Sequence, residues 1–239
     1  MLVTTKAIVL SSLKYGDTSL IIKIFTKSDG LKSYLLKGIL ASKKSKLKPA
    51  LFQPLTQLEL VAVHKNKGTL ERIREAKVSY HYQTLHTNIL KNSLVLFLSE
   101  MLSITIQEEA ENSSLFEYMT YAFFWLDAHE EISNFHILFL LELTKYLGWY
   151  PDTSQSHLPY FDLQEGCFVS ISNLNPTLRG ELLDNFKQFL GINFDKLLAI
   201  KLNNNSRQEL LKKLLLYFQL HSHGFRKPKS LAVLNAVFQ

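Results

Sequence analysis

The sequence predicts an α+β protein in which a small five-stranded β-barrel (residues 1–79) precedes an α-helical domain (residues 80–239). Three observations support this division. Apolar and polar residues alternate up to about residue 80, which is typical of strands, and beyond that point apolar residues recur at helical spacing. The net charge also changes sign between the two parts, so they differ in function as well as in fold.

Composition limits the class of protein. The 239 residues, 46% of them hydrophobic and 12% aromatic, are enough to bury a core. No apolar run approaches the roughly 20 residues of a membrane-spanning helix, and Met1–Ala7 carries no signal-peptide core. We therefore expect a cytoplasmic protein with no membrane partner. The single cysteine, Cys167, excludes an internal disulfide and any zinc site built on a cysteine pair.

Short alternating segments in the first part predict five strands. Their bounds are Ala7–Leu10, Thr18–Thr26, Leu31–Lys37, Gln57–Val63 and Thr69–Ala76. Tight turns at Tyr15–Asp17, Ser28–Gly30 and Lys65–Gly68 favour antiparallel neighbours. Closure into a barrel would remove the edges that an open sheet of this size exposes.

The second part predicts helices interrupted by one hairpin. Apolar residues at helical spacing, cap residues and stop glycines predict helices over Leu85–Leu102, Ser114–Leu126, Ser133–Leu147, Asn175–Phe189, Ser206–His221 and Leu231–Leu234. A hairpin near residues 155–172 is predicted from Tyr160–Leu163 and Cys167–Val169, joined by a turn containing Gly166. Because a lone hairpin is marginally stable in water, we expect it to pack on the helices.

The charges are divided unevenly along the chain. Residues 1–80 carry 15 basic and 5 acidic side chains, a net charge of +10, whereas residues 81–239 carry 12 basic and 16 acidic ones, a net of −4. Such asymmetry indicates that the first part meets a polyanion. The alternative is a basic surface without a dedicated partner.

No catalytic motif is found. The sequence has no Gly-rich phosphate loop, no G-x-S-x-G turn and no His-Glu-x-x-His helix. The closest histidine pair, His221 and His223, has no third ligand nearby, and Cys167 is best interpreted as a small buried apolar residue. We therefore expect no enzyme and no cofactor or metal; a nuclease with an unrecognised site is the less favoured alternative.

Nucleic-acid binding fits the basic barrel better. Lysines along a groove can follow phosphates while aromatic side chains stack on bases. The candidate backbone contacts are Lys14, Lys37, Lys43, Lys44, Lys46, Lys48, Arg72 and Arg74, four of them in the loop over residues 38–54. The candidate stacking residues are Tyr15, Tyr34 and Phe52, for each of which core packing is the alternative. An RNA-binding barrel protein remains open as a second function.

Several segments together resemble the RecO family of bacterial recombination mediators. In the first part these are Ala7–Leu10, Tyr15–Leu20, Ile24–Thr26, Leu36–Gly38, Lys43–Ser45 and Leu51–Pro54. In the second part they are Lys145–Pro151, Tyr160–Gly166 and Ser230–Leu234. The resemblance covers nearly the whole chain in the same order.

This resemblance implies an OB-fold barrel followed by an α-helical domain, with no catalytic activity. It implies binding of single- and double-stranded DNA, annealing of complementary strands, and loading of RecA onto DNA coated with single-strand-binding protein (SSB), together with RecR. It also places the protein in the cytoplasm with the nucleoid. Many members carry a four-cysteine zinc site between the third helix and the next. This chain has only Cys167 there, so we expect packing of the hairpin to replace the zinc.

The resemblance further implies that the acidic SSB tail, which ends in an apolar residue, docks on the helical domain. Such a tail needs an apolar pocket with a cation beside it. The candidate partner-binding residues are Leu141, Lys145, Arg207 and Lys212. Ordinary exposed helix charges are the alternative for each cation.

Overall fold

The computed structural model describes residues 1–41, 47–65, 67–107 and 110–238 and divides into two compact units, residues 1–128 and 129–239. The first contains strands β1 (Leu2–Tyr15), β2 (Ser19–Thr26), β3 (Gly30–Leu36), β4 (Gln57–Val63) and β5 (Arg72–Val78), a 3-10 turn η1 (Pro49–Phe52), and helices α1 (Ile89–Thr105) and α2 (Ser113–Ala128). The second contains α3 (Phe135–Tyr146), β6 (Tyr160–Asp162), β7 (Cys167–Val169), β8 (Thr177–Arg179), α4 (Gly180–Lys187), α5 (Phe194–Leu197), α6 (Asn204–His221) and α7 (Leu231–Val237).

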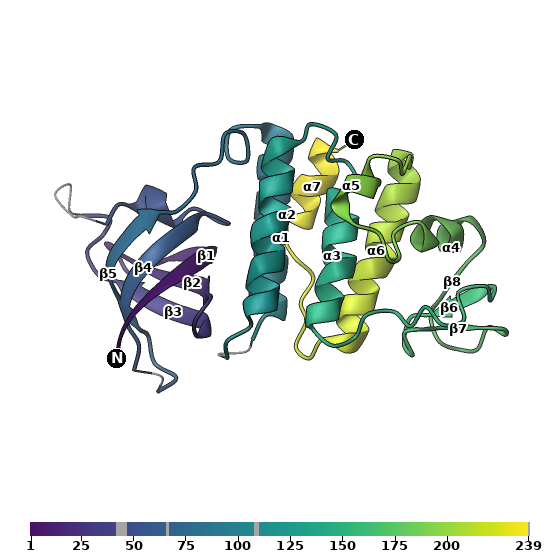
Figure 1. The fold of residues 1–239 in the computed structure, drawn as a ribbon, viewed down its shortest axis with the longest axis horizontal. Helices are drawn as coiled ribbons and strands as arrows, with labels where there is room; N and C mark the ends of the chain where they lie inside the picture. The colour runs from purple at the N-terminus through teal and green to yellow at the C-terminus, as the bar shows by residue number, and fades with distance from the viewer. Residues whose placement is uncertain (42–46, 66, 108–109, 239) are drawn as a thin grey trace. The chain divides into compact units, whose positions relative to one another are not determined.

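The five N-terminal strands form the predicted barrel. Their order is β3-β2-β1-β4-β5, with antiparallel neighbours throughout (Figure 1). A bridge between Tyr34 and Glu71 joins the two ends of this sheet, which confirms the closed five-stranded OB-fold barrel. This single bridge, just before the start of β5, closes the sheet without a full ladder between β3 and β5.

Strand β1 is much longer than the sequence predicted. It spans 14 residues because it pairs with β2 on one side and with β4 on the other. The register shifts between Val9 and Ser11, so a bulge bends the strand around the barrel. The prediction of Ala7–Leu10 captured only the buried middle of this strand, where side chains on both faces are covered.

Apolar side chains fill the barrel and close it at one end. Val9, Ile22, Ile24 and Leu60 are wholly buried in one cluster. Phe52 from η1 joins this cluster at 1% exposure. The interpretation of Phe52 as a base-stacking residue is therefore wrong, and its ring packs the core.

Asp127 on α2 ties the segment after the barrel to the helices of the same unit. Its carboxylate accepts hydrogen bonds from the backbone N–H groups of Gln83, Thr84 and Leu85 at 2.8–3.0 Å. The Lys91 ammonium donates to the Asp127 carbonyl at 2.6 Å. Burial acts to raise the pKa of Asp127, but these N–H donors and the Thr84 hydroxyl outweigh it and lower the pKa.

Hydrogen bonds to one buried carboxylate hold the small sheet of the second unit, whose order is β7-β6-β8. Asp162, at the end of β6, is fully buried. It accepts from the backbone of Gln164 and from the side-chain amides of Asn173 and Asn175 at 2.9–3.0 Å. Phe161 packs on Phe186 of α4 at a ring distance of 4.9 Å, so the hairpin packs on the helices as expected.

The predicted helix start at Asn175 is wrong. Residues Thr177–Arg179 form β8, which pairs with β6, and helix α4 begins only at Gly180. The physical reason is that the Asn175 side chain is drawn to Asp162, while Leu178 pairs with Phe161 and is buried. The hairpin is thus part of a three-stranded sheet. The other helix predictions correspond to α1, α2, α3, α6 and α7 with shifted ends.

We predict that Asp127→Ala lowers the free energy of unfolding by about 2–3 kcal/mol, because the backbone N–H groups of Gln83, Thr84 and the buried Leu85 lose a charged acceptor. Because the pKa of Asp127 is lowered in the folded state, its contribution is complete above the ordinary value of 3.8 and is lost as the pH falls below that value. Urea unfolding at neutral and acidic pH measures both effects. Asp184→Ala, at an exposed position of α4, is the control and should change stability little. Equal stability of the two variants at neutral pH would contradict this role for Asp127.

Candidate nucleic-acid interface

The barrel closes at a short seam between β3 and the start of β5. Glu71 donates its backbone N–H to the Ser33 carbonyl at 2.8 Å and accepts from the Leu35 N–H at 3.1 Å. These bonds fix the position of Arg72, the next residue in the chain, relative to the end of β3. The seam therefore brings two segments that are more than 30 residues apart in sequence to one place.

Buried polar groups lie beside the seam. The Tyr34 hydroxyl lies 2.6 Å from His64 Nε2, and His64 Nδ1 lies 3.0 Å from Asp29 Oδ2. Burial, followed by the charges of Asp29 and Glu71, raises the pKa of Tyr34, so its hydroxyl stays protonated and can donate to His64. His64 then has its Nδ1–H available to donate to the Asp29 carboxylate.

This burial corrects one predicted contact. Tyr34 is 0% exposed and belongs to the barrel core, so its ring is not available to stack on a base. Tyr15, by contrast, is 57% exposed at the end of β1. Of the two tyrosines proposed from the sequence, Tyr15 alone has an accessible ring.

A groove of about 420 Å³, here called the seam groove, runs along the closure. Its lining consists of Leu35, Leu36, Lys37, Ile39, Leu47, Lys65, Leu70, Glu71, Arg72 and Ile73. The three cations are exposed, whereas Glu71 is 3% exposed and its Oε1 accepts the Lys65 N–H at 2.8 Å. Among the described lining residues, the one acid is therefore turned into the protein and the cations face solvent. Such a surface favours a polyanion.

The structure brings several predicted contacts to this groove. Lys37 and Arg72 line it, and Lys48 is exposed next to the lining residue Leu47. The turn that follows Lys14 and Tyr15 lies beside the end of β3, since the Leu40 N–H donates to the Thr18 carbonyl at 3.0 Å. Arg74 is exposed farther along β5 and does not line the groove. The remaining predicted contacts, Lys43, Lys44 and Lys46, lie outside the described residues.

Two cations of the β4–β5 turn were not among the DNA contacts predicted from the sequence. Lys65 lines the seam groove, and Lys67 is exposed two residues later. The sequence Lys65-Asn66-Lys67-Gly68 was interpreted as a hairpin turn alone. The two lysines of this turn could have been predicted as DNA contacts, because OB folds bind oligonucleotides with their loops 1–2 and 4–5.

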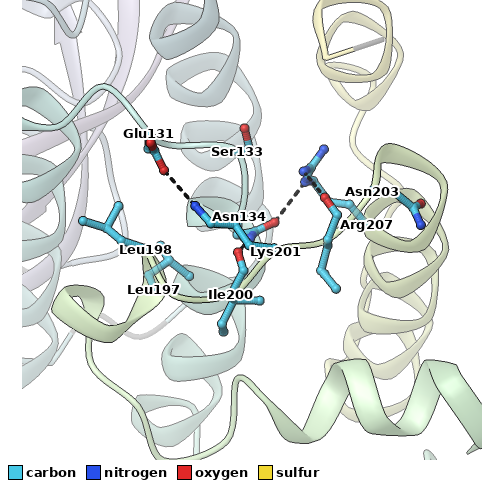
Figure 2. Close-up of a pocket in the computed structure, with 10 residues that line it drawn as sticks. Glu131, Ser133, Asn134, Leu197, Leu198, Ile200, Lys201, Asn203 and Arg207 are labelled. Atoms are coloured by element: carbon cyan, nitrogen blue, oxygen red, sulfur yellow. Dashed lines mark hydrogen bonds and ion pairs between the residues drawn. The ribbon is translucent and has the colours of Figure 1, made fainter.

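A second candidate site lies within the unit of residues 129–239. This pocket of about 410 Å³, here called the Arg207 pocket, is lined by Glu131, Ser133, Asn134, Leu197, Leu198, Ile200, Lys201, Leu202, Asn203 and Arg207 (Figure 2). Its lining combines apolar side chains, such as Leu197 and Leu198, with polar and charged ones. Lys201 pairs with Glu131 at 3.2 Å across the pocket.

The guanidinium of Arg207 is held in a fixed position. Its Nε donates to Asn134 Oδ1 at 3.0 Å and its Nη2 donates to the Leu202 carbonyl at 2.9 Å. Burial lowers the pKa of Arg207, but a guanidinium remains charged at neutral pH. The pocket therefore combines a rigid cation with apolar side chains, the combination that an acidic peptide with an apolar end requires.

The other predicted partner residues do not join Arg207. Leu141 is 1% exposed and lies in the lining of a separate, small apolar pocket with Ile137 and Lys213, so its role as a partner contact stays a prediction. Lys145 pairs with Glu142 at 2.6 Å and lies 4.5 Å from the centre of the Tyr150 ring. Lys212 is exposed on α6, outside the lining of the Arg207 pocket. Partner binding by Lys145 and Lys212 stays a prediction.

Comparisons with known proteins identify the family. Residues 1–82 match the sequence model described as recombination protein O N terminal, and residues 86–232 match the one described as recombination protein O C terminal. The chain belongs to the RecO family. Proteins named DNA repair protein RecO are 51% identical in Christiangramia forsetii, 47% in Flavobacterium psychrophilum and 36% in Bacteroides fragilis, each over the full length of both chains.

Two further features concern the described part of this RecO family member. None of its described helices combines the length and the apolar character needed to cross a bilayer. Nor do three or more His, Cys, Asp or Glu side chains in the described part of the chain come together as a metal site. At the hairpin, the Asp162 carboxylate accepts hydrogen bonds from Gln164, Asn173 and Asn175, and the expected replacement of zinc by packing stays a prediction.

We predict that the triple variant Lys37→Ala, Lys65→Ala, Arg72→Ala binds single-stranded DNA on the order of tenfold more weakly and makes the slope of log K against log salt shallower by about 2. Fluorescence anisotropy across a salt series measures both quantities. A matched control removes three exposed cations of the second unit, at Lys196, Arg226 and Lys227. If both triple variants changed binding equally, net charge and not the seam groove would account for the affinity.

Proposed function

We propose that the chain is a non-enzymatic recombination mediator in DNA repair, which binds and anneals single-stranded DNA. The observation that carries this proposal is the seam groove, where exposed Lys37, Lys65 and Arg72 surround an apolar floor on a closed barrel. Family membership adds support, since the relatives are named DNA repair proteins.

The proposed mechanism is electrostatic. Two DNA strands repel each other through their phosphates, and cations that neutralise part of this charge reduce the repulsion. Apolar side chains beside the cations, such as Leu70 at 41% exposure, offer contact to the sugar and base faces of an unpaired strand. No covalent bond is made or broken. A strand is bound, paired with its complement and then released.

The unit of residues 129–239 carries 11 basic and 10 acidic side chains and is close to neutral, so it attracts DNA less than the basic barrel does. We propose that the Arg207 pocket receives the acidic C-terminal tail of SSB, with the guanidinium facing the terminal carboxylate and Leu197, Leu198 and Ile200 facing the apolar last residue. Binding of this tail would bring the barrel to coated DNA. Together with RecR, the protein would then help to load RecA in the cytoplasm.

An annealing assay tests the central proposal. We predict that the protein accelerates pairing of complementary DNA strands without magnesium and that the triple variant Lys37→Ala, Lys65→Ala, Arg72→Ala does so at least several-fold more slowly, because strand repulsion is less screened. The release of a dye from single strands on pairing follows the rate. Matched RNA strands test whether the acceleration is specific for DNA. An unchanged rate in the triple variant, or equal activity on RNA, would contradict the proposal.

A peptide titration tests the Arg207 pocket. We predict that Leu198→Glu weakens binding of an acidic peptide with an apolar last residue about tenfold, because the new carboxylate repels it within the pocket. Ala199→Glu adds the same charge one residue away, outside the pocket lining, and is the matched control. Isothermal titration measures both affinities. Equal weakening by the two variants would place the peptide elsewhere on this unit.

A further inference from the structure

A second groove lies between the barrel and helix α2. It has a volume of about 520 Å³ and is lined by β1, β4, the segment after β5, and α2, all within the first compact unit. We call it the tyrosine groove, after Tyr80 and Tyr121 in its lining. None of its lining residues belongs to the seam groove. The two grooves can therefore be occupied at the same time.

The tyrosine groove presents aromatic rings to solvent. Tyr80 is 39% exposed and Tyr121 is 49% exposed, although both are large apolar rings. One side of the Tyr80 ring packs on Phe124, with 4.4 Å between ring centres, and Tyr82 meets it edge-on at 5.2 Å. Packing on these neighbours fixes the orientation of the Tyr80 ring before any ligand arrives.

The walls of the groove are also held in place. The buried Gln57 on β4 donates its side-chain amide to the Tyr82 hydroxyl at 2.7 Å. Phe116 of α2, which lines the groove, stacks with the buried Phe25 of β2 at a ring distance of 6.4 Å. The groove is thus a built feature of the fold, with an aromatic wall supported from both the barrel and the helix.

Charge distinguishes this groove from the seam groove. Its described lining carries two lysines, Lys6 and Lys27, and two glutamates, Glu59 and Glu117. Lys27 pairs with Glu117 at 3.0 Å, while Lys77, just outside the lining, pairs with Glu59 at 2.7 Å. The groove is therefore close to neutral and is poorly suited to neutralising a run of phosphates. Its exposed rings suit the flat faces of unpaired bases, which stack on aromatic side chains whatever their sequence.

We propose that the tyrosine groove holds the second strand during annealing by stacking its unpaired bases on Tyr80 and Tyr121. This inference rests on the proposed annealing function. One strand lies along the seam groove, held mainly through its phosphates, and the other presents its bases at the tyrosine groove. The volume of about 520 Å³ lies within the range of small-ligand sites, about 300–1,000 Å³, and so admits a base with its sugar.

The test compares two double variants of the full chain. Tyr80→Leu, Tyr121→Leu removes the ring faces and keeps apolar side chains, whereas Tyr80→Phe, Tyr121→Phe keeps the rings and is the matched control. Because both positions are exposed, thermal unfolding should show that each variant remains folded. The probes are an oligothymidine and an abasic oligomer of the same length, titrated at raised salt, where phosphate contacts contribute less.

We expect the wild type and the phenylalanine variant to bind oligothymidine about tenfold more tightly than the abasic oligomer, and the leucine variant to lose this preference. The leucine variant should also anneal complementary strands about tenfold more slowly, while its salt slope for single-stranded DNA stays unchanged. Equal behaviour of the leucine and phenylalanine variants would overturn the proposal, as would a wild type that binds both oligomers equally. The latter result would indicate that another class of ligand, such as a peptide, occupies the groove.

The two proposals fail in different ways. An unchanged affinity and salt slope in the Lys37→Ala, Lys65→Ala, Arg72→Ala variant would contradict the seam groove and the proposed function, whatever the tyrosines do. A wild type that does not anneal, but prefers oligothymidine through Tyr80 and Tyr121, would refute the second-strand role and the annealing function together. Slow annealing by the leucine variant alone, with normal annealing by the phenylalanine variant, would support stacking at this groove.

Discussion

Closure of the barrel at Glu71 is the constraint on which the rest of the first unit depends. Two backbone hydrogen bonds replace a full ladder there, and beside them the buried Tyr34 and His64 are hydrogen-bonded to each other and to the half-buried Asp29. Each of these groups has a hydrogen-bond partner. A buried polar group without one would cost about 1–3 kcal/mol. Because the seam is fixed, the cations beside it project from a defined backbone and form one surface.

Much of the fold could be predicted from the sequence, because the spacing of apolar residues within a segment reflects which face of that strand or helix is buried. Alternating apolar residues predicted the strand Gln57–Val63 to the residue, and helical spacing predicted the buried α1. The errors arose where distant groups decide the structure. Polar Thr4 and Lys6 concealed the first half of β1, whose partner is β4. Asn175 followed by proline is typical of a helix start, but the buried Asp162 draws its side chain into a small sheet.

The candidate site was partly predictable for the same reason. The excess of basic residues in the first part indicated a basic barrel. The contacts predicted there include Lys37 and Arg72, which line the seam groove. Burial of Tyr34 could not be predicted from the pattern of β3 alone. It depends on the bridge between Tyr34 and Glu71, a residue distant in sequence. The tyrosine groove left no signal in any one segment, since its lining comes from strands and a helix that are distant in sequence. Spacing within a segment cannot reveal a surface that several segments share.

The contacts between the barrel and α2 determine which fragments of this chain are useful for experiments. Cutting at residue 79 would remove Phe116 from the buried Phe25 and expose an aromatic ring that is now 1% accessible. It would also delete one wall of the tyrosine groove and the carboxylate of Asp127. Residues 1–128 keep all of these contacts, so this longer piece, and not the bare barrel, is the suitable unit for dissecting DNA binding apart from partner recruitment.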